Sequence, residues 1–230
     1  MEIIETVTRS PLFGVFLTLL AYIIGTYINK KTGKVYLNNL LIAYIIVIGT
    51  LLIFKIPVEN YNNGANIITS CLGPVTAVLA ISIYNQRKKV KENLLPIIIG
   101  TLAGSITSIG SVIVLAKLFG LDWPTTASVI PKSVTTAIAL AISDSLGGYI
   151  AITAICVVIT GCSGNILSPY LIKLFRFTDP VAEGLAIGTA SHALGTSKAI
   201  ELGEIQGAFS SIAITFAGLI TVVITLLMVI

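Results

Sequence analysis

One stretch decides the fold of this chain: Pro131-Lys132-Ser133-Val134-Thr135-Thr136. It lies inside an apolar run, residues 124–142, that otherwise resembles a membrane-spanning helix. Proline distorts a helix, and a lysine and several hydroxyl groups are costly in hydrocarbon. Irregular polar backbone is tolerated at membrane depth only where it lines a protected cavity. The stretch therefore predicts an interrupted segment of a membrane protein, with a polar site beside it.

A second stretch has the same character. Residues 187–200 contain Gly188-Thr189-Ala190-Ser191-His192-Ala193-Leu194-Gly195-Thr196-Ser197-Lys198, with the only histidine of the chain. This segment is too polar for a plain lipid-facing helix. We expect the two stretches to form one site.

The composition supports a membrane protein throughout. The 230 residues are 55% hydrophobic and only 10% charged, with a mean hydropathy of +0.99, whereas soluble domains carry roughly 25% charged residues. The apolar runs are long and continuous, unlike the short alternating strands of outer-membrane barrels. The net charge of +4 is concentrated in short loops, so it indicates membrane orientation and not nucleic-acid binding.

The runs predict an all-α polytopic bundle of about six to eight transmembrane segments, forming a single membrane domain. Those at 124–142 and 181–199 are expected to be broken or re-entrant, and the sequence leaves open whether they cross. We expect the Asn-rich residues 60–64 to form a loop. The full set of runs is 11–28, 37–54, 65–84, 94–119, 124–142, 149–172, 181–199 and 208–230.

Basic loops predict the orientation. The lysines of residues 30–34 and the cluster at 86–91 are expected in the cytoplasm. Lys173 and Arg176 join them there only if residues 124–142 enter and leave the membrane by the same face.

Internal similarities suggest a repeat. Residues 74–82 resemble 134–143, and residues 115–119 resemble 171–175, which suggests repeats over 64–120, 124–178 and 181–230. Chance similarity of small-residue composition is the alternative. Interrupted segments in corresponding positions are a sequence sign of a transporter site.

Lys132 has two interpretations. Its ammonium could extend to the headgroups along an apolar stem, or it could face a cavity and balance an anionic substrate. In the second case a helix starting near Ser133 would add free N–H groups and a positive dipole end. His192 could be a satisfied core histidine, hold a substrate hydroxyl, or couple proton movement.

The candidate substrate-binding residues comprise two groups. The principal ones are Lys132, Ser133, Thr135, Thr136, Ser191, His192, Gly195, Thr196 and Ser197; the weaker ones, which could instead be kinks or packing positions, are Gly73, Pro74, Thr76 and Asn165.

Catalytic, metal and cofactor sites are not expected. The three cysteines, Cys71, Cys156 and Cys162, lie in apolar runs without ligand spacing. One histidine with scattered aspartates forms no hydrolase triad, and no nucleotide-binding motif is present. We therefore predict a protein that is not an enzyme.

These stretches also resemble a known family. The residues that carry the resemblance to the LrgB/CidB family are Pro131-Lys132-Ser133-Val134-Thr135-Thr136, Ala190-Ser191-His192-Ala193-Leu194-Gly195-Thr196, Ala199-Ile200-Glu201-Leu202-Gly203-Glu204, Pro11-Leu12-Phe13-Gly14, Leu40-Leu41-Ile42-Ala43 and Leu72-Gly73-Pro74. The family often has proline where this chain has Ala137, which bears on how sharply the following helix bends.

The resemblance implies a multi-pass inner-membrane protein, expected to be a homo-oligomer and to work with a small LrgA/CidA-type membrane protein. Its bacterial members are described as antiholin-like regulators of murein hydrolases, while plastid relatives carry glycolate and glycerate and some bacterial members are linked to pyruvate. We expect a secondary transporter of such monocarboxylates; the alternative is a holin- or antiholin-like regulator of lysis. The substrate, the coupling ion and the need for a partner are left open.

Overall fold

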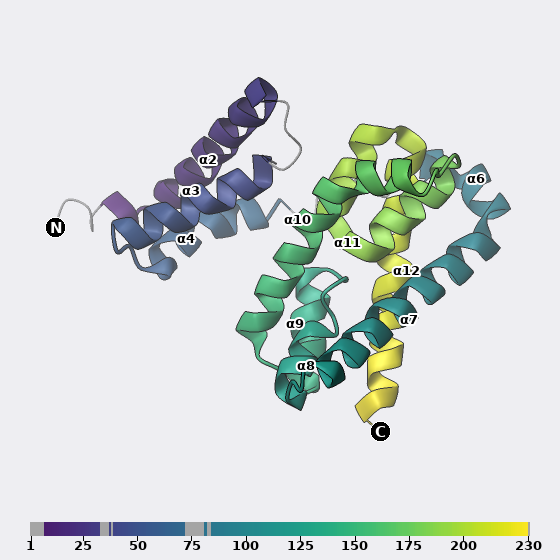
Figure 1. The fold of residues 1–230 in the computed structure, drawn as a ribbon. Helices are drawn as coiled ribbons and strands as arrows, with labels where there is room; N and C mark the ends of the chain where they lie inside the picture. Colours follow the sequence, from purple (N-terminus) through teal and green to yellow (C-terminus); the bar gives the residue numbers. More distant parts are fainter. Residues whose placement is uncertain (1–6, 33–36, 38, 72–80, 82–83, 230) are drawn as a thin grey trace. The chain divides into compact units, whose positions relative to one another are not determined.

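The computed structural model describes residues 7–32, 37, 39–71, 81 and 84–229; most of these are in helices joined by short turns, and there is no strand among them (Figure 1). The predicted all-α fold is therefore confirmed. Four helices are long and apolar enough to cross a bilayer: α2, α7, α10 and α12. The chain divides into two compact units, Met1–Val78 and Leu79–Ile230.

The first unit contains α2 (Pro11–Thr32), α3 (Asn39–Ile53) and α4 (Val58–Thr69). The prediction of a loop at residues 60–64 is wrong, because these residues belong to α4. The reason is packing: Gly64 and Gly14 let the backbones of α4 and α2 touch, and the Tyr61 hydroxyl lies 2.9 Å from the hydroxyl of Thr18. Asn60 also has a partner inside the unit, since its amide donates to the Thr8 hydroxyl over 3.2 Å, whereas Asn62 and Asn63 are exposed on the helix.

The predicted interruption at Gly73 and Pro74, together with Thr76, lies outside the described residues.

The second unit is built from three long helices with two interrupted segments between them (Figure 1). Its elements are α6 (Arg87–Glu92), α7 (Leu94–Leu118), α8 (Trp123–Val129), α9 (Thr136–Ser145), α10 (Ile150–Leu174), α11 (Pro180–Leu202) and α12 (Glu204–Val229).

The first interrupted segment, α8 and α9, is re-entrant. The indole N–H of Trp123, at the start of α8, donates to the carbonyl of Leu146, just beyond the end of α9, over 3.0 Å. Nearby, the backbone N–H of Tyr149 donates to the Ser128 hydroxyl over 2.6 Å. The segment therefore enters and leaves on one side, with Pro131 and Lys132 in the turn between its helices. We call it the first hairpin.

The second interrupted segment is α11. Its helical geometry fails at Ser191 (φ −137°, ψ 20°) and His192 (φ 43°, ψ −144°). The side chain of Gln206 in α12 donates to Glu183, in the first turn of α11, over 2.9 Å. Since α12 begins directly after α11 ends, both ends of α11 lie on the same side. We call α11 the second hairpin.

The two hairpins enter from opposite sides. Asn93, before α7, and Asp179, before α11, line one groove, so α11 starts where α7 starts, whereas α8 follows the far end of α7. The prediction that both segments are interrupted is confirmed, and both re-enter. Lys173 and Arg176 consequently lie on the same side as the basic helix α6; that this side is cytoplasmic stays a prediction.

Helices α7 and α10 end alike. Both close on a residue in the left-handed region, Gly120 (φ 67°) and Arg176 (φ 54°). The hydrogen bonds around these residues correspond: Phe119 N to Leu115 O and Leu121 N to Ala116 O in the first, Phe175 N to Leu171 O and Phe177 N to Ile172 O in the second. Each end leads into a hairpin. The predicted repeat over 64–120, 124–178 and 181–230 remains a prediction; the likeness seen here is between α7 with the first hairpin and α10 with the second, which divides the chain differently.

Candidate anion-binding site

Lys132 lies in the turn of the first hairpin and is half-buried. Its Nζ donates to the Ser133 hydroxyl over 3.1 Å and to the Ser108 hydroxyl over 3.3 Å. The two hydroxyl oxygens are 3.0 Å apart, so the three groups form a closed triangle. Ser108 belongs to α7.

The triangle lies deep in the unit. Ser108 is roughly 21 Å along α7 from its start and about 15 Å from its end, at a rise of ~1.5 Å per residue. A bilayer core is about 30 Å thick. In the described part of the chain, the polar partners of the Lys132 ammonium are hydroxyls, and no carboxylate forms an ion pair with it. A lysine ammonium has three N–H donors, and two of them are used here.

A small cavity of about 10 Å³ adjoins the triangle. Ser108 and Ser133 line it, with Ser105 and Thr221 from the long helices and Thr189 from the second hairpin. The volume suffices for about one water molecule. The Ser105 hydroxyl is buried, with 3% of the residue exposed, and has no hydrogen-bond partner among the described residues. This cavity is where the two hairpins meet.

The remaining candidates of the first stretch lie at the start of α9. Thr135 precedes the helix in an extended conformation and makes no capping bond with its side chain, and Thr136 is exposed. Helix α9 begins at Thr136, three residues after Ser133, near which the cavity-facing interpretation of Lys132 placed a helix start. A backbone turn, Val134 N to Pro131 O, holds residues 131–134 and delays the helix.

The candidates of the second stretch form a separate cluster. The His192 ring Nε2 lies 3.0 Å from the Val157 carbonyl oxygen of α10. A carbonyl only accepts, so Nε2 carries the proton. Gly161 makes room for the ring, because a Cβ there would meet His192 Cε1 at 2.6 Å. The Thr196 hydroxyl bonds the His192 carbonyl and the Ser210 hydroxyl, at 2.9 and 2.7 Å.

Asn165 extends this cluster from α10. Its amide nitrogen donates to the Leu194 carbonyl over 2.8 Å and to the Ser197 hydroxyl over 2.9 Å. Ser191 bonds the carbonyl of Ile187 in its own helix, and Gly195 packs against it. The expected single site is thus divided in this structure: the second stretch reaches the Lys132 cavity through Thr189, and its other candidates connect α10 and α12 to the second hairpin.

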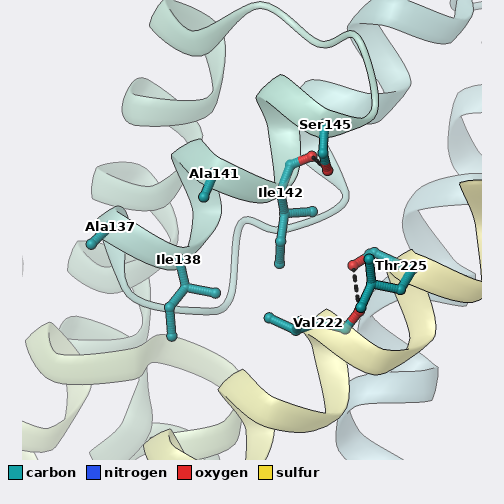
Figure 2. A pocket seen from close by; sticks show the side chains of 8 residues that line it. Ala137, Ile138, Ala141, Ile142, Ser145, Val222 and Thr225 are labelled. Carbon is teal, nitrogen blue, oxygen red and sulfur yellow. Dashed lines mark hydrogen bonds between the residues drawn. The ribbon is translucent and has the colours of Figure 1, made fainter.

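A larger groove of about 380 Å³ lies elsewhere, between α9 and α12 (Figure 2). Figure 2 shows Ile138, Ala141 and Ile142 facing Val222 across it. The hydroxyls of Ser145 and Thr225 bond carbonyls of their own helices. Such a lining suits hydrocarbon rather than a carboxylate.

Metal binding finds no support in the described residues, among which no group of three or more His, Cys, Asp or Glu side chains could hold an ion. The predicted absence of a metal, a cofactor and an enzymatic reaction stays a prediction.

Comparison with known proteins identifies the family. The LrgB-like family matches residues 18–230. The chain belongs to this family. Its LrgB relatives include proteins named "Antiholin-like protein LrgB" from Bacillus mycoides (strain KBAB4), Bacillus cereus (strain B4264) and Bacillus anthracis (strain CDC 684 / NRRL 3495), each 40% identical over 218 residues, or 94% of this chain and 95% of the relative. No solved structure matches the chain significantly.

The family and the four apolar helices together identify a multi-pass membrane protein.

Proposed function

We propose that this LrgB-family protein is a secondary transporter of small monocarboxylates of the pyruvate, glycolate and glycerate type. The observation that carries the proposal is the Lys132 ammonium, which bonds Ser108 near the middle of α7 and has hydroxyl partners but no carboxylate partner among the described residues. An intramembrane charge is costly and rare, and where it occurs it usually marks a substrate or ion pathway.

The position of Lys132 favours this interpretation over an interfacial lysine. A lysine that extends to the headgroups would turn its ammonium toward a helix end, whereas here the ammonium bonds Ser108 near the centre of α7. The unpartnered Ser105 hydroxyl lines the same cavity as the Ser108 and Ser133 hydroxyls that hold the Lys132 ammonium, so an anion bound there would lie beside the cation's partners. The opposed hairpins fit a transporter as well, since irregular segments of paired repeats commonly build substrate sites near the midplane.

An antiholin-like role is the second candidate, and the comparisons favour it. The relatives carry the name "Antiholin-like protein", and their names mention no carboxylate. In this alternative the chain regulates murein hydrolase activity and lysis as an oligomer or with a small LrgA/CidA-type partner in the inner membrane. Lys132 would then be replaceable without loss of function.

The test is uptake of labelled pyruvate, glycolate and glycerate into proteoliposomes, with wild type compared with Lys132→Ala. Each preparation is assayed with and without an imposed pH gradient and a small LrgA/CidA-type partner. We expect saturable uptake by the wild type and its loss in the correctly folded variant. No uptake under any condition would refute transport and leave the antiholin-like role; uptake indifferent to Lys132→Ala would retain transport and reject this site.

A further inference from the structure

We propose that the Lys132 cavity is an inner binding site that is reached along one face of α7, and that the methyl group of Thr189 is its gate. The proposal rests on the proposed function only for the identity of the ligand. The route and the gate are argued from the packing of α7 against the second hairpin.

The route begins at a groove of about 300 Å³ between the first halves of α7 and α11. Asn93 and Asp179 line its outer end, Gly100 lies on its α7 wall, and Thr189 is also part of its lining. Thr189 is the one residue that this groove shares with the Lys132 cavity. The open groove and the closed cavity therefore meet at a single side chain.

The α7 face explains why the route follows this line. Gly100, Gly104 and Ser108 are spaced four residues apart, so they lie on one face of the helix. The first two have no side chain, and the third holds the Lys132 ammonium. One helix face thus leads from the groove, past two glycines, to the cation.

The methyl group of Thr189 blocks the path along this face of α7 from the groove to the cavity. Its hydroxyl donates to the Leu185 carbonyl in its own helix over 2.7 Å, which directs the methyl elsewhere. That methyl, Cγ2, packs where Gly104 lacks a side chain: a Cβ on Gly104 would meet it at 2.6 Å. The narrow point between the groove and the cavity is therefore formed by the Thr189 methyl group packed against the backbone of α7 at Gly104.

The unpartnered hydroxyl of Ser105 indicates that a ligand binds in the cavity beyond the Thr189 methyl group. Its buried hydroxyl lines the cavity without a described partner, and an unsatisfied buried donor is costly until an acceptor arrives. The cavity holds about one water-sized atom group. The cavity can therefore take a carboxylate oxygen, and the rest of the ligand fits only when the Thr189 methyl group moves away. Because its buried hydroxyl lacks a described partner, Ser105 is a further ligand-binding residue in this proposal.

The test uses the full-length protein in membranes, with Cys71, Cys156 and Cys162 replaced and Ser105→Cys introduced as reporter. The probe is the anionic thiol reagent 2-sulfonatoethyl methanethiosulfonate. Two variants separate the groups of Thr189: Thr189→Ser keeps the hydroxyl and removes the methyl, whereas Thr189→Val removes the hydroxyl and keeps a methyl. A third, Thr153→Ala, removes a buried threonine of α10 away from the route and controls for general loosening.

We expect Thr189→Ser to accelerate labelling about tenfold, because labelling of a buried thiol follows the population of the open form. Thr189→Val and Thr153→Ala should leave the rate close to that of the parent. Equal acceleration by Thr189→Val or Thr153→Ala, or no acceleration by Thr189→Ser, would overturn the gate. Labelling needs no transport, so a negative uptake assay with the expected labelling pattern would refute the proposed function and leave the route standing.

Discussion

The two hairpins are both interrupted helical segments, but their polar side chains differ in charge and in the partners that they bond. The first carries a cation whose polar partners in the described chain are neutral hydroxyls, beside the unpartnered donor of Ser105. The second carries His192, whose ring bonds the Val157 carbonyl, and Thr196, which bonds Ser210. We therefore propose that the first hairpin receives an anion, while the polar groups of the second connect it to its neighbours. Interrupted helices in one protein need not share a purpose.

The largest expected effect comes from removing the cation. Lys132→Met should lower anion uptake roughly tenfold to hundredfold, since a hydrogen bond to a charged group contributes about 1.5–3 kcal/mol. It should also raise the unfolding temperature in detergent, because a half-buried charge without a carboxylate partner among the described residues is replaced by an apolar side chain of similar length.

Lys117→Met is the matched control for this change, because Lys117 is exposed in the last turn of α7. It should leave both uptake and unfolding temperature nearly unchanged. A Lys132→Met protein that keeps its uptake and loses stability would show that the lysine is structural, and the contrast between the hairpins would fail.

His192→Ala should have the opposite outcome. We expect the free energy of unfolding to fall by about 2–4 kcal/mol, because the Val157 carbonyl loses its side-chain donor and a cavity forms beside Gly161. Uptake by the protein that remains folded should persist, with its dependence on a pH gradient unchanged. Thermal unfolding and gradient-driven uptake measure the two effects separately. Loss of gradient dependence at unchanged stability would instead assign His192 to proton coupling.

Asn165→Ala tests the other connection of the second hairpin. It removes the two hydrogen bonds to Leu194 and Ser197, and we expect the free energy of unfolding to fall by about 1–3 kcal/mol. Ser163→Ala, at an exposed position two residues earlier in α10, serves as control and should change little. An Asn165→Ala protein that is stable but has a higher KM for uptake would place Asn165 in the substrate site after all.

The sequence was informative where chemistry conflicted with hydropathy. Proline and lysine inside an apolar run were enough to predict the first interruption, and the Gly/Ser/Thr-rich surroundings of His192 predicted the second. The sequence could not decide whether these segments cross or re-enter, because that depends on distant contacts such as the one between Trp123 and Leu146. The Asn-rich part of α4 misled for the same reason: the side chains of Asn60 and Tyr61 have their partners in distant residues, Thr8 and Thr18.

The site was partly predictable from the sequence. Lys132 stands out in any apolar run, whereas Ser105 and Ser108 look like the other small residues of α7 and gain their role only when the first hairpin folds against them. Thr189 lies within the second stretch but was not singled out, since its role depends on Gly104 opposite. His192 was predicted for its chemistry, yet its position is explained by one carbonyl on α10.

The smallest effect tests whether the second hairpin is a connected unit. Thr196→Val and Ser210→Ala each remove one hydroxyl of a 2.7 Å pair that joins α11 to α12. Hydrogen bonds between membrane helices contribute about 0.6 kcal/mol on average and up to ~1.7, so each single change should lower the free energy of unfolding within that range. The double variant should cost less than the sum, because residues in contact are coupled. Strict additivity in this cycle would mean that the two hydroxyls do not stabilise each other, and the second hairpin would then be held to α12 by packing alone.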